Sequence, residues 1–368
     1  MYIIRFQYLL VFLFVSHSFL CLSQDESNIV YYGKDYFILE GTEIDESLKE
    51  NPYDRLPLSY KNVVRKPVWE LSKNSSGMSI RFFSNSTSIH AKWTLLNDLS
   101  MNHMADTGVK GIDLYFNNNG TWQYLNTARP NGKENVFELM NSMSPKMREY
   151  KMFLPLYDGV KSLEVGIDCN SVIKKPKKNT SKSIVFYGTS ITQGCCASRP
   201  GMAHTNIISR KLNIDCINFG FSGNGRMEEP INELISESNP LFYVIECLPN
   251  MKEEEVATKA IPLVNTIRKK HPETPIIFVE NFIYETVALN EKKAVEINVK
   301  NKALKDQYTK LIDNNVKNVF YISAEKATGI DHEGTVDGVH FTDLGFIRYA
   351  NFLIDRFEKL DLLPKQSR

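Results

Sequence analysis

Three residues of this chain have the types of a nucleophile, an acid and a base. Ser190 stands in a glycine-flanked segment at residues 188–194, and Asp337 and His340, three residues apart, follow about 150 residues later. A serine hydroxyl becomes a nucleophile when a base takes its proton and an acid holds that base in the correct tautomer. These residues therefore predict acyl transfer, with the serine attacking a carbonyl carbon.

Two further segments could hold the negative charge that develops on the attacked carbonyl. Residues 220–225 contain three glycines, among them Gly223, and such a segment leaves backbone amides open to an anion. Asn250 falls just after an apolar segment, because Pro249 cannot continue a central strand. The side-chain amide of Asn250 could then donate to an oxyanion.

Each of these residues also fits an ordinary structural role when it is judged alone. Ser190 could cap a helix, and the glycine segment and Asn250 could form turns. Asp343 is predicted to cap the last helix. The joint occurrence of the candidates after successive strand-like segments favours one catalytic site over several unrelated turns.

The carboxyl-terminal half alternates apolar strands with helical segments. We expect strands at residues 183–187, 216–219, 241–245, 275–279 and 319–322, and helices at 206–212, 227–236, 253–270, 290–314 and 346–360. This alternation predicts a three-layer α/β/α domain with a parallel sheet and right-handed crossovers. Ligands of such sheets bind beyond the carboxyl ends of the strands, so the candidate residues should meet there.

The amino-terminal half has the pattern of an all-β domain without convincing helices. Its short segments alternate polar and apolar residues with a period of two, and a turn at residues 117–120 indicates a hairpin. A further strand is expected at residues 151–157. We predict a jelly-roll-like β-sandwich at residues 24–173, a basic linker at 174–182 and the α/β domain at 183–368.

The first 23 residues differ from the rest of the chain. Arg5 precedes an apolar run at residues 8–22, and small residues precede Gln24, as in a secretory signal peptide. A membrane anchor is the alternative, although the run is short for a full span, and Cys21 leaves a lipid anchor open. We expect export to the periplasm or the cell exterior, and no stable membrane insertion after cleavage.

Composition and the remaining polar residues argue against other kinds of protein. The formal net charge of +1 is not that of a nucleic-acid-binding protein. The cysteines match no zinc spacing, and His204 and His332 belong to no cluster of ligands, so no metal is expected. Cys195 and Cys196, beside the serine segment, should pack in the core, with a vicinal disulfide left open.

These segments resemble the SGNH or GDSL-like hydrolase superfamily, which carries Ser, Gly, Asn and His in four separate blocks. Residues 188–194 resemble the first of these blocks, Gly223 matches the second and Asn250 the third. Residues 337–340 match the last, which is counted as the fifth block of the superfamily. The third block departs from the usual Gly-x-Asn-Asp, since residues 248–251 read Leu-Pro-Asn-Met.

The amino-terminal half resembles the β domain of a narrower bacterial subfamily, which bears a Gly-x-Asp-Leu-Tyr signature. Residues 111–115 match that signature in full. Because Asp113 and Tyr115 alternate with apolar neighbours, we expect a polar face that lies near the catalytic cleft and helps to shape it.

The resemblance implies a flavodoxin-like hydrolase domain that cleaves acyl esters without a metal or an organic cofactor. His340 would remove the Ser190 proton, Asp337 would orient His340, and the amides of Ser190 and Gly223 with the Asn250 side chain would bind the oxyanion. Export and the added β domain suggest acetyl esters of glycans. The alternatives are a lipid or lysophospholipid esterase, or a glycan-binding protein with an inert hydrolase domain, and the oligomeric state is left open.

Overall fold

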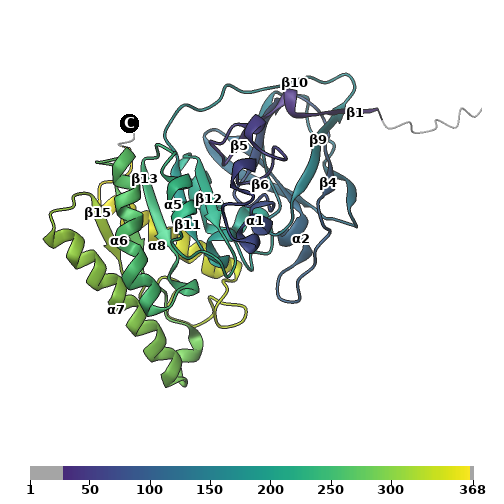
Figure 1. The fold of residues 1–368 in the computed structure, drawn as a ribbon. Helices are drawn as coiled ribbons and strands as arrows, with labels where there is room; N and C mark the ends of the chain where they lie inside the picture. The colour runs from purple at the N-terminus through teal and green to yellow at the C-terminus, as the bar shows by residue number, and fades with distance from the viewer. Residues whose placement is uncertain (1–27, 365–368) are drawn as a thin grey trace, which may run out of the picture.

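Two domains lie side by side in the computed structural model, which describes residues 28–364 (Figure 1). Antiparallel strands form the first domain, and a parallel sheet flanked by helices forms the second. The predicted signal peptide and Cys21 lie outside the described residues. Within the described part of the chain, no helix has both the length and the apolar character needed to span a membrane.

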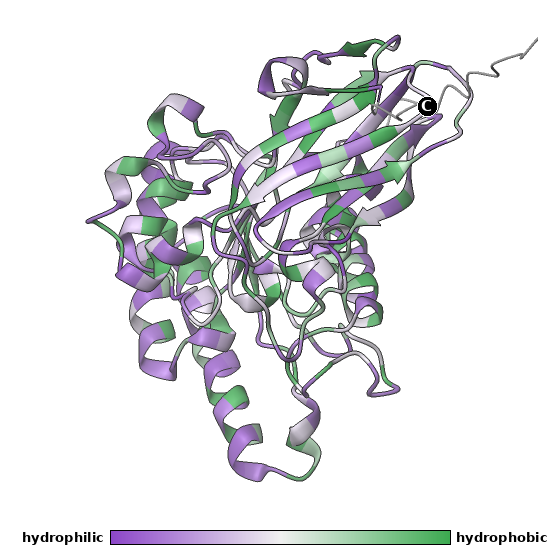
Figure 2. Ribbon diagram, turned by 90° about the vertical axis from the view of Figure 1, so that its right-hand side faces the viewer, coloured by the Kyte–Doolittle hydropathy of each residue, from purple (hydrophilic) through white to green (hydrophobic). Residues whose placement is uncertain are grey.

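The amino-terminal domain packs two antiparallel sheets around one apolar core. The first sheet has the order β1 (Ile29–Tyr32), β9 (Val160–Asp168), β4 (Ile89–Leu95) and β7 (Glu134–Met140). The second has the order β10 (Ile173–Lys174), β3 (Ser79–Ser84), β8 (Arg148–Phe153), β5 (Ile112–Asn118) and β6 (Thr121–Ala128), and β2 (Ile38–Glu40) also pairs with β3. Hydrophilic and hydrophobic residues alternate along these strands (Figure 2). The predicted antiparallel β domain is therefore confirmed.

Local details of this domain partly differ from the expectation. The predicted hairpin is present: Asn119 and Gly120 join β5 to β6 with φ of 51° and 90°, the geometry of a type I′ turn. The strand expected at residues 151–157 ends instead at Phe153, two residues before Pro155, which has no N–H for a ladder. Two short helices, α1 (Lys66–Ser72) and α2 (Asp106–Lys110), are not predicted by the sequence.

The carboxyl-terminal domain is a five-stranded parallel sheet between two layers of helices. The sheet has the order β12 (Cys216–Gly220), β11 (Ile184–Gly188), β13 (Phe242–Glu246), β14 (Ile276–Val279) and β15 (Val319–Ile322). Helices α4 (His204–Leu212) and α8 (Asp343–Lys359) pack on one face, and α5 (Glu229–Ile235), α6 (Glu253–Lys270) and most of α7 (Glu291–Asp313) pack on the other. This strand order is that of flavodoxin-like sheets, so the expected fold class is confirmed.

Three neighbouring strands of this sheet end at the same level. Gly188, the last residue of β11, is paired with Gly220 of β12 on one side and with Glu246 of β13 on the other. The loops that carry the candidate residues Ser190, Gly223 and Asn250 start from these strand ends. The parallel topology thus brings residues distant in sequence to one edge.

The start of α8 corrects one expectation. Thr342, not Asp343, caps this helix, since its Oγ1 accepts from the Gly345 N–H at 3.2 Å. The Asp343 carboxylate instead accepts from the N–H and the hydroxyl of Ser198, at 2.9 and 2.5 Å. Asp343 therefore fastens the last helix to the segment that follows the serine turn.

Candidate active site

The serine stands on a tight turn between β11 and a one-turn helix, α3 (Ser190–Gln193). Thr189 caps this helix, and its Oγ1 accepts from the Ile191 N–H at 3.4 Å. A Cβ added to Gly188 would come within 2.0 Å of the Thr192 hydroxyl, so the turn requires glycine there. The capping role considered for Ser190 thus falls to its neighbour, and the Ser190 hydroxyl is free for another partner.

That partner is His340, in the loop before α8. Its Nε2 lies 3.0 Å from the Ser190 Oγ, and its Nδ1 lies 2.7 Å from the Asp337 Oδ2. The other oxygen of Asp337 accepts from the backbone N–H groups of Val339 and His340, at 3.0 and 2.7 Å. The three residues predicted to work together therefore form one hydrogen-bonded chain.

The charge on Asp337 fixes the protonation pattern of this chain. Partial burial works to raise the pKa of the Asp337 carboxyl, but the hydrogen bonds from the His340 side chain and from the backbone outweigh that effect and lower the pKa. The ionised Asp337 carboxylate accepts a hydrogen bond from the Nδ1–H of His340, so the proton stays on Nδ1. The lone pair on Nε2 then faces the serine hydroxyl, which is the arrangement of a general base beside its nucleophile.

The buried carboxylate of Glu246 anchors the serine turn. The Glu246 carboxylate accepts from the Thr192 hydroxyl at 2.9 Å and from the Tyr349 hydroxyl at 2.6 Å, and it lies 3.2 Å from the Nε2 of His204. Burial works to raise the pKa of Glu246, but His204 and these hydrogen bonds outweigh it and lower the pKa. The anchored turn keeps the serine in place without using its own hydroxyl.

The two predicted oxyanion segments also come together. Asn250, at the end of a 3-10 turn (Leu248–Asn250), accepts from the Gly225 N–H through its side-chain oxygen at 3.2 Å. This contact orients the amide so that its NH2 group is available for another acceptor. Gly223 has φ of +69°, and a Cβ on it would meet no atom within 4 Å. The Gln193 side chain ties this loop to the serine turn by accepting from the Ser222 N–H at 3.0 Å.

Comparisons with known proteins agree with this geometry. The family model of the GDSL-like Lipase/Acylhydrolase family matches residues 181–358, and a model of the N-terminus of SGNH-hydrolase-type esterases, named GxDLY, matches residues 30–173. A crystal structure from Bacteroides ovatus, described as that of a GDSL-like lipase, is 34% identical with a TM-score of 0.87. The match covers 91% of this chain and 99% of that one. The chain belongs to the GDSL-like lipase/acylhydrolase family. It is a carboxylic ester hydrolase.

More distant structures share the fold of this GDSL-like esterase. The salicylyl-acyltransferase of a tetracycline biosynthetic pathway has a TM-score of 0.76 at 13% identity, and the match covers 92% of this chain and 99% of that one. A family two carbohydrate esterase from Clostridium thermocellum, in complex with cellohexaose, has a TM-score of 0.57 at 13% identity. That match covers 78% of this chain and 94% of the other. No curated protein matches the chain.

The Gly-x-Asp-Leu-Tyr signature of this esterase holds the two domains together. The Asp113 carboxylate accepts from the Arg199 guanidinium and from the Gly201 N–H, each at 2.7 Å, and the Tyr115 hydroxyl lies 2.6 Å from Arg199. Asp113 is fully buried, and a Cβ on Gly201 would lie 2.2 Å from the Tyr115 hydroxyl. The polar side chains of the signature, Asp113 and Tyr115, therefore contact the segment that follows the serine turn. The Asp113 carboxylate is occupied there by Arg199.

A second β-domain residue, Arg55, supports the end of β12. Its buried guanidinium donates to the carbonyl oxygens of Asn218 and Gly220, at 3.1 and 2.6 Å. It also donates to two carbonyls of its own domain, those of Leu71 and Asn74. Burial lowers the pKa of Arg55 to about 9. The strand end that leads to the Gly223 loop is thus held from the other domain.

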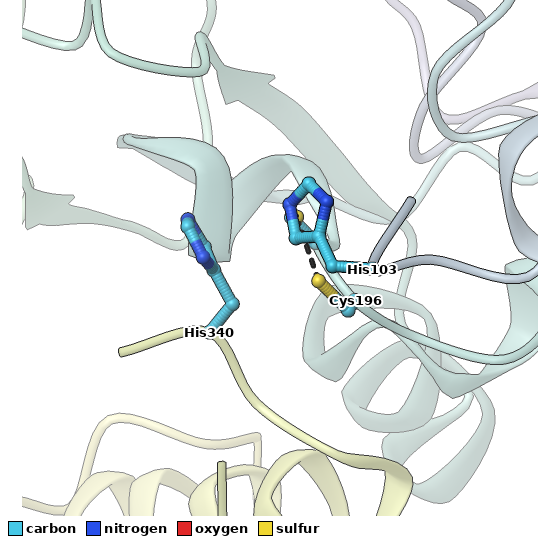
Figure 3. Close-up of side chains that lie close together, drawn as sticks. His103, Cys196 and His340 are labelled. Carbon is cyan, nitrogen blue, oxygen red and sulfur yellow. Dashed lines mark hydrogen bonds between the residues drawn. The ribbon is translucent and has the colours of Figure 1, made fainter. Parts of the chain in front are cut away.

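A third β-domain residue, His103, lies close to His340. The His103 and His340 rings lie near each other, with their centroids 5.7 Å apart (Figure 3). The Nε2 of His103 lies 3.6 Å from the Cys195 sulfur. Sequence reasoning did not find His103, because a single histidine in the polar loop between β4 and α2 carries no pattern. Cys195 and Cys196 are 1% and 6% exposed, so the expected burial of both is confirmed.

Proposed function

We propose that this esterase hydrolyses acyl esters through Ser190, His340 and Asp337 and a covalent acyl-enzyme. His340 takes the Ser190 proton as the hydroxyl oxygen attacks the ester carbonyl, and Asp337 stabilises the imidazolium that forms. His340 then gives the proton to the leaving alcohol. The hydrogen-bonded chain from Ser190 Oγ through His340 to Asp337 is the observation that carries the proposal.

The oxyanion of the tetrahedral intermediate is bound by the backbone amides of Ser190 and Gly223 and by the side-chain amide of Asn250. One such donor lowers the barrier by about 3 kcal/mol. Water then attacks the acyl-enzyme, with His340 again acting as the base, and the acid leaves while Ser190 regains its proton. The mechanism requires only groups that the chain supplies.

The favoured substrate is an acetyl ester of a glycan outside the cytoplasm. The fold shared with carbohydrate esterases supports a glycan ester, and the predicted signal peptide supports export.

A lipid or lysophospholipid ester is the second candidate, favoured by one feature of the surface. An apolar depression of about 480 Å³ lies beside the catalytic loop and is lined by Phe282, Ile283, Tyr284 and Ile330 among others. The Glu285 N–H at its rim donates to the Gly338 carbonyl of that loop at 3.3 Å. The acyl chain of a long-chain ester bound at Ser190 could extend into this depression.

The two candidates are separated by rates on nitrophenyl esters of graded chain length and on acetylated oligosaccharides. We expect the highest kcat/KM for acetyl esters and acetate release from the oligosaccharides, with none from Ser190→Ala. Faster turnover of long-chain esters would select the lipid candidate. A Ser190-independent affinity for glycans, together with no turnover by the wild type, would leave a binding protein with an inert hydrolase domain.

A further inference from the structure

Four side chains with metal-binding atoms converge beside the proposed nucleophile. They are His103, Cys195, Cys196 and His340, and their ligand atoms all lie within 4.8 Å of one another. The four come from three segments: the loop after β4, the segment after the serine turn and the loop before α8. Figure 3 shows one side chain from each segment, His103, Cys196 and His340. The proposed ester mechanism uses His340 alone, so three soft or borderline donors remain without a role.

The spacing of these donors is close to that of a tetrahedral zinc site. Zn–S bonds of about 2.3 Å and Zn–N bonds of about 2.0 Å place the sulfurs about 3.8 Å apart and each sulfur about 3.5 Å from each nitrogen. The distance from Cys195 Sγ to His103 Nε2 is 3.6 Å. The two sulfurs are 3.0 Å apart, so the pair must open by less than about 1 Å to hold one ion. The most widely separated donors, within 4.8 Å of each other, must approach by up to about 1.3 Å.

Both imidazoles already present the nitrogen that a metal needs. The Nδ1 of His103 lies 2.9 Å from the side-chain oxygen of Asn102, and the Nδ1 of His340 lies 2.7 Å from Asp337. An acceptor at Nδ1 keeps the proton there and leaves the lone pair on Nε2 free, as it does for most histidine ligands in metal sites. The outer contacts of a Cys2His2 site are therefore in place.

The segment that carries His103 is also held firmly. Asp158 accepts from the backbone N–H groups of Asn97 and Leu99 at 3.0 and 2.9 Å, and Asp98 pairs with Lys110 at 2.6 Å. Met104, the next residue after His103, is buried in the apolar core of the hydrolase domain. These contacts position the imidazole of the β domain without help from a ligand.

We propose that His103, Cys195, Cys196 and His340 bind one Zn²⁺ ion, and that the bound ion switches the esterase off. Two thiolates balance the charge of the ion, so a buried site becomes electrically neutral. The ion takes the Nε2 lone pair of His340, which is the same lone pair that accepts the Ser190 proton. Metal binding and turnover therefore exclude each other. The binding claim stands by itself, whereas the inhibition claim rests on the proposed function.

Binding is tested without activity, in the Ser190→Ala protein, after the thiols have been reduced and counted and the protein freed of metal. Titration with Co²⁺ should give one equivalent with the thiolate-to-metal absorption and the intense visible bands of a tetrahedral site, and Zn²⁺ should displace it. Cys195→Ser, Cys196→Ser and His103→Gln, each added to Ser190→Ala, should weaken binding by more than about 100-fold, beyond the loss expected for an outer contact alone. Cys169→Ser, at an exposed cysteine, is the matched control and should bind as the parent does.

Inhibition is tested in the protein that retains Ser190. One equivalent of Zn²⁺ should abolish turnover, and EDTA should restore it. The His103→Gln variant should need at least about 100-fold more Zn²⁺ to lose half of its own metal-free rate. No thiolate absorption with reduced protein, or absorption that persists in both cysteine variants, overturns the site. Because His103 is partly exposed while the cysteines are buried, it tests the site even if a cysteine variant does not fold. Binding without inhibition would retain the site and contradict the role given to His340.

Discussion

The two domains contribute to one site in different ways. From the hydrolase domain come the hydroxyl of Ser190, the imidazole of His340 and the carboxylate of Asp337, all on loops at the strand ends of one sheet. The β domain contributes stabilising contacts, called fastenings below: Asp113 forms an ion pair with Arg199, and Arg55 donates to a carbonyl at the end of β12. One region supplies the proposed reacting groups, and the other stabilises the segments that carry them.

This difference predicts which property each substitution changes. A change at a proposed reacting group should lower the rate and leave the fold intact, because Asp337 and His340 are at least partly exposed and the serine turn is held without the Ser190 hydroxyl. A change at a fastening should lower the free energy of unfolding, because it leaves a buried charge without its partner. The division fails if the two kinds of substitution give similar results.

The largest effect is expected for Ser190→Ala. Removing the nucleophile should lower kcat for nitrophenyl acetate by roughly 10⁶-fold, as for other serine hydrolases that lose this group. The melting temperature should stay within a few degrees of the wild type, since the Thr189 cap and the Glu246 anchor do not use the Ser190 hydroxyl. Retention of more than a hundredth of the rate would exclude Ser190 as the nucleophile.

Asp337→Asn should have the next largest effect. An asparagine amide donates to Nδ1 of His340, so the proton moves to Nε2 and the imidazole can no longer act as a base. We expect kcat to fall by about 10⁴-fold with little change in KM. An equal loss in KM and kcat would indicate that Asp337 binds substrate instead.

Asn250→Ala should lower kcat by about 10²- to 10³-fold, the cost of one oxyanion donor. The Gly225 N–H also loses one of its two acceptors, the other being the Phe221 carbonyl, so Asn250→Asp serves as the matched control. The aspartate keeps that acceptor but has no NH2 group to give. A rate in Asn250→Asp close to that of the wild type would remove Asn250 from the oxyanion site.

Asp113→Ala should act on stability more than on rate. It leaves Arg199 without its carboxylate, and the free energy of unfolding should fall by about 3 kcal/mol in urea titrations. Tyr115→Phe is the matched control, because it removes only one hydrogen bond to Arg199, at a cost of about 1 kcal/mol. At a temperature where both proteins are folded, kcat should stay within about tenfold of the wild type. A fall comparable to that of Asp337→Asn would place the β domain among the reacting groups.

The smallest effect concerns pH. The folded pKa of Asp337 lies below its ordinary value of 3.8. Its contribution to stability is therefore present above about pH 4 and is lost as pH falls through the folded pKa. The difference in unfolding free energy between wild type and Asp337→Asn should shrink as pH is lowered from 5 to about 3. A difference that grows over that range would show that the carboxylate is destabilised in the fold.

The sequence predicts the hydrolase-domain part of this site because local geometry dictates it. Gly188 and the apolar strand before it are needed for the turn at Ser190, and the spacing of Asp337 and His340 lets the acid reach its base. The parallel order of the strands then brings these loops to one edge. Each of these features can be recognised from a short stretch of the sequence.

The contribution of the β domain is harder to predict, since it depends on contacts between segments far apart in the chain. Asp113 was recognised in its signature, but its partner Arg199 lies 86 positions away, and only packing closes that polar face. His103 carries no pattern at all. The sequence predicts Asp343 as the cap of α8, but its neighbour Thr342 has the extended backbone that a cap needs, with ψ of 170°.

The most direct test of the central claim is covalent labelling with an aryl fluorophosphonate followed by peptide mass spectrometry. This reagent reacts with a serine whose proton is taken by a neighbouring base. We predict one adduct per chain, on the peptide that contains Ser190, formed in step with the loss of esterase activity and absent from a His340→Ala variant. An inactivating adduct on any other residue, or full activity in a chain labelled at Ser190, would contradict the account.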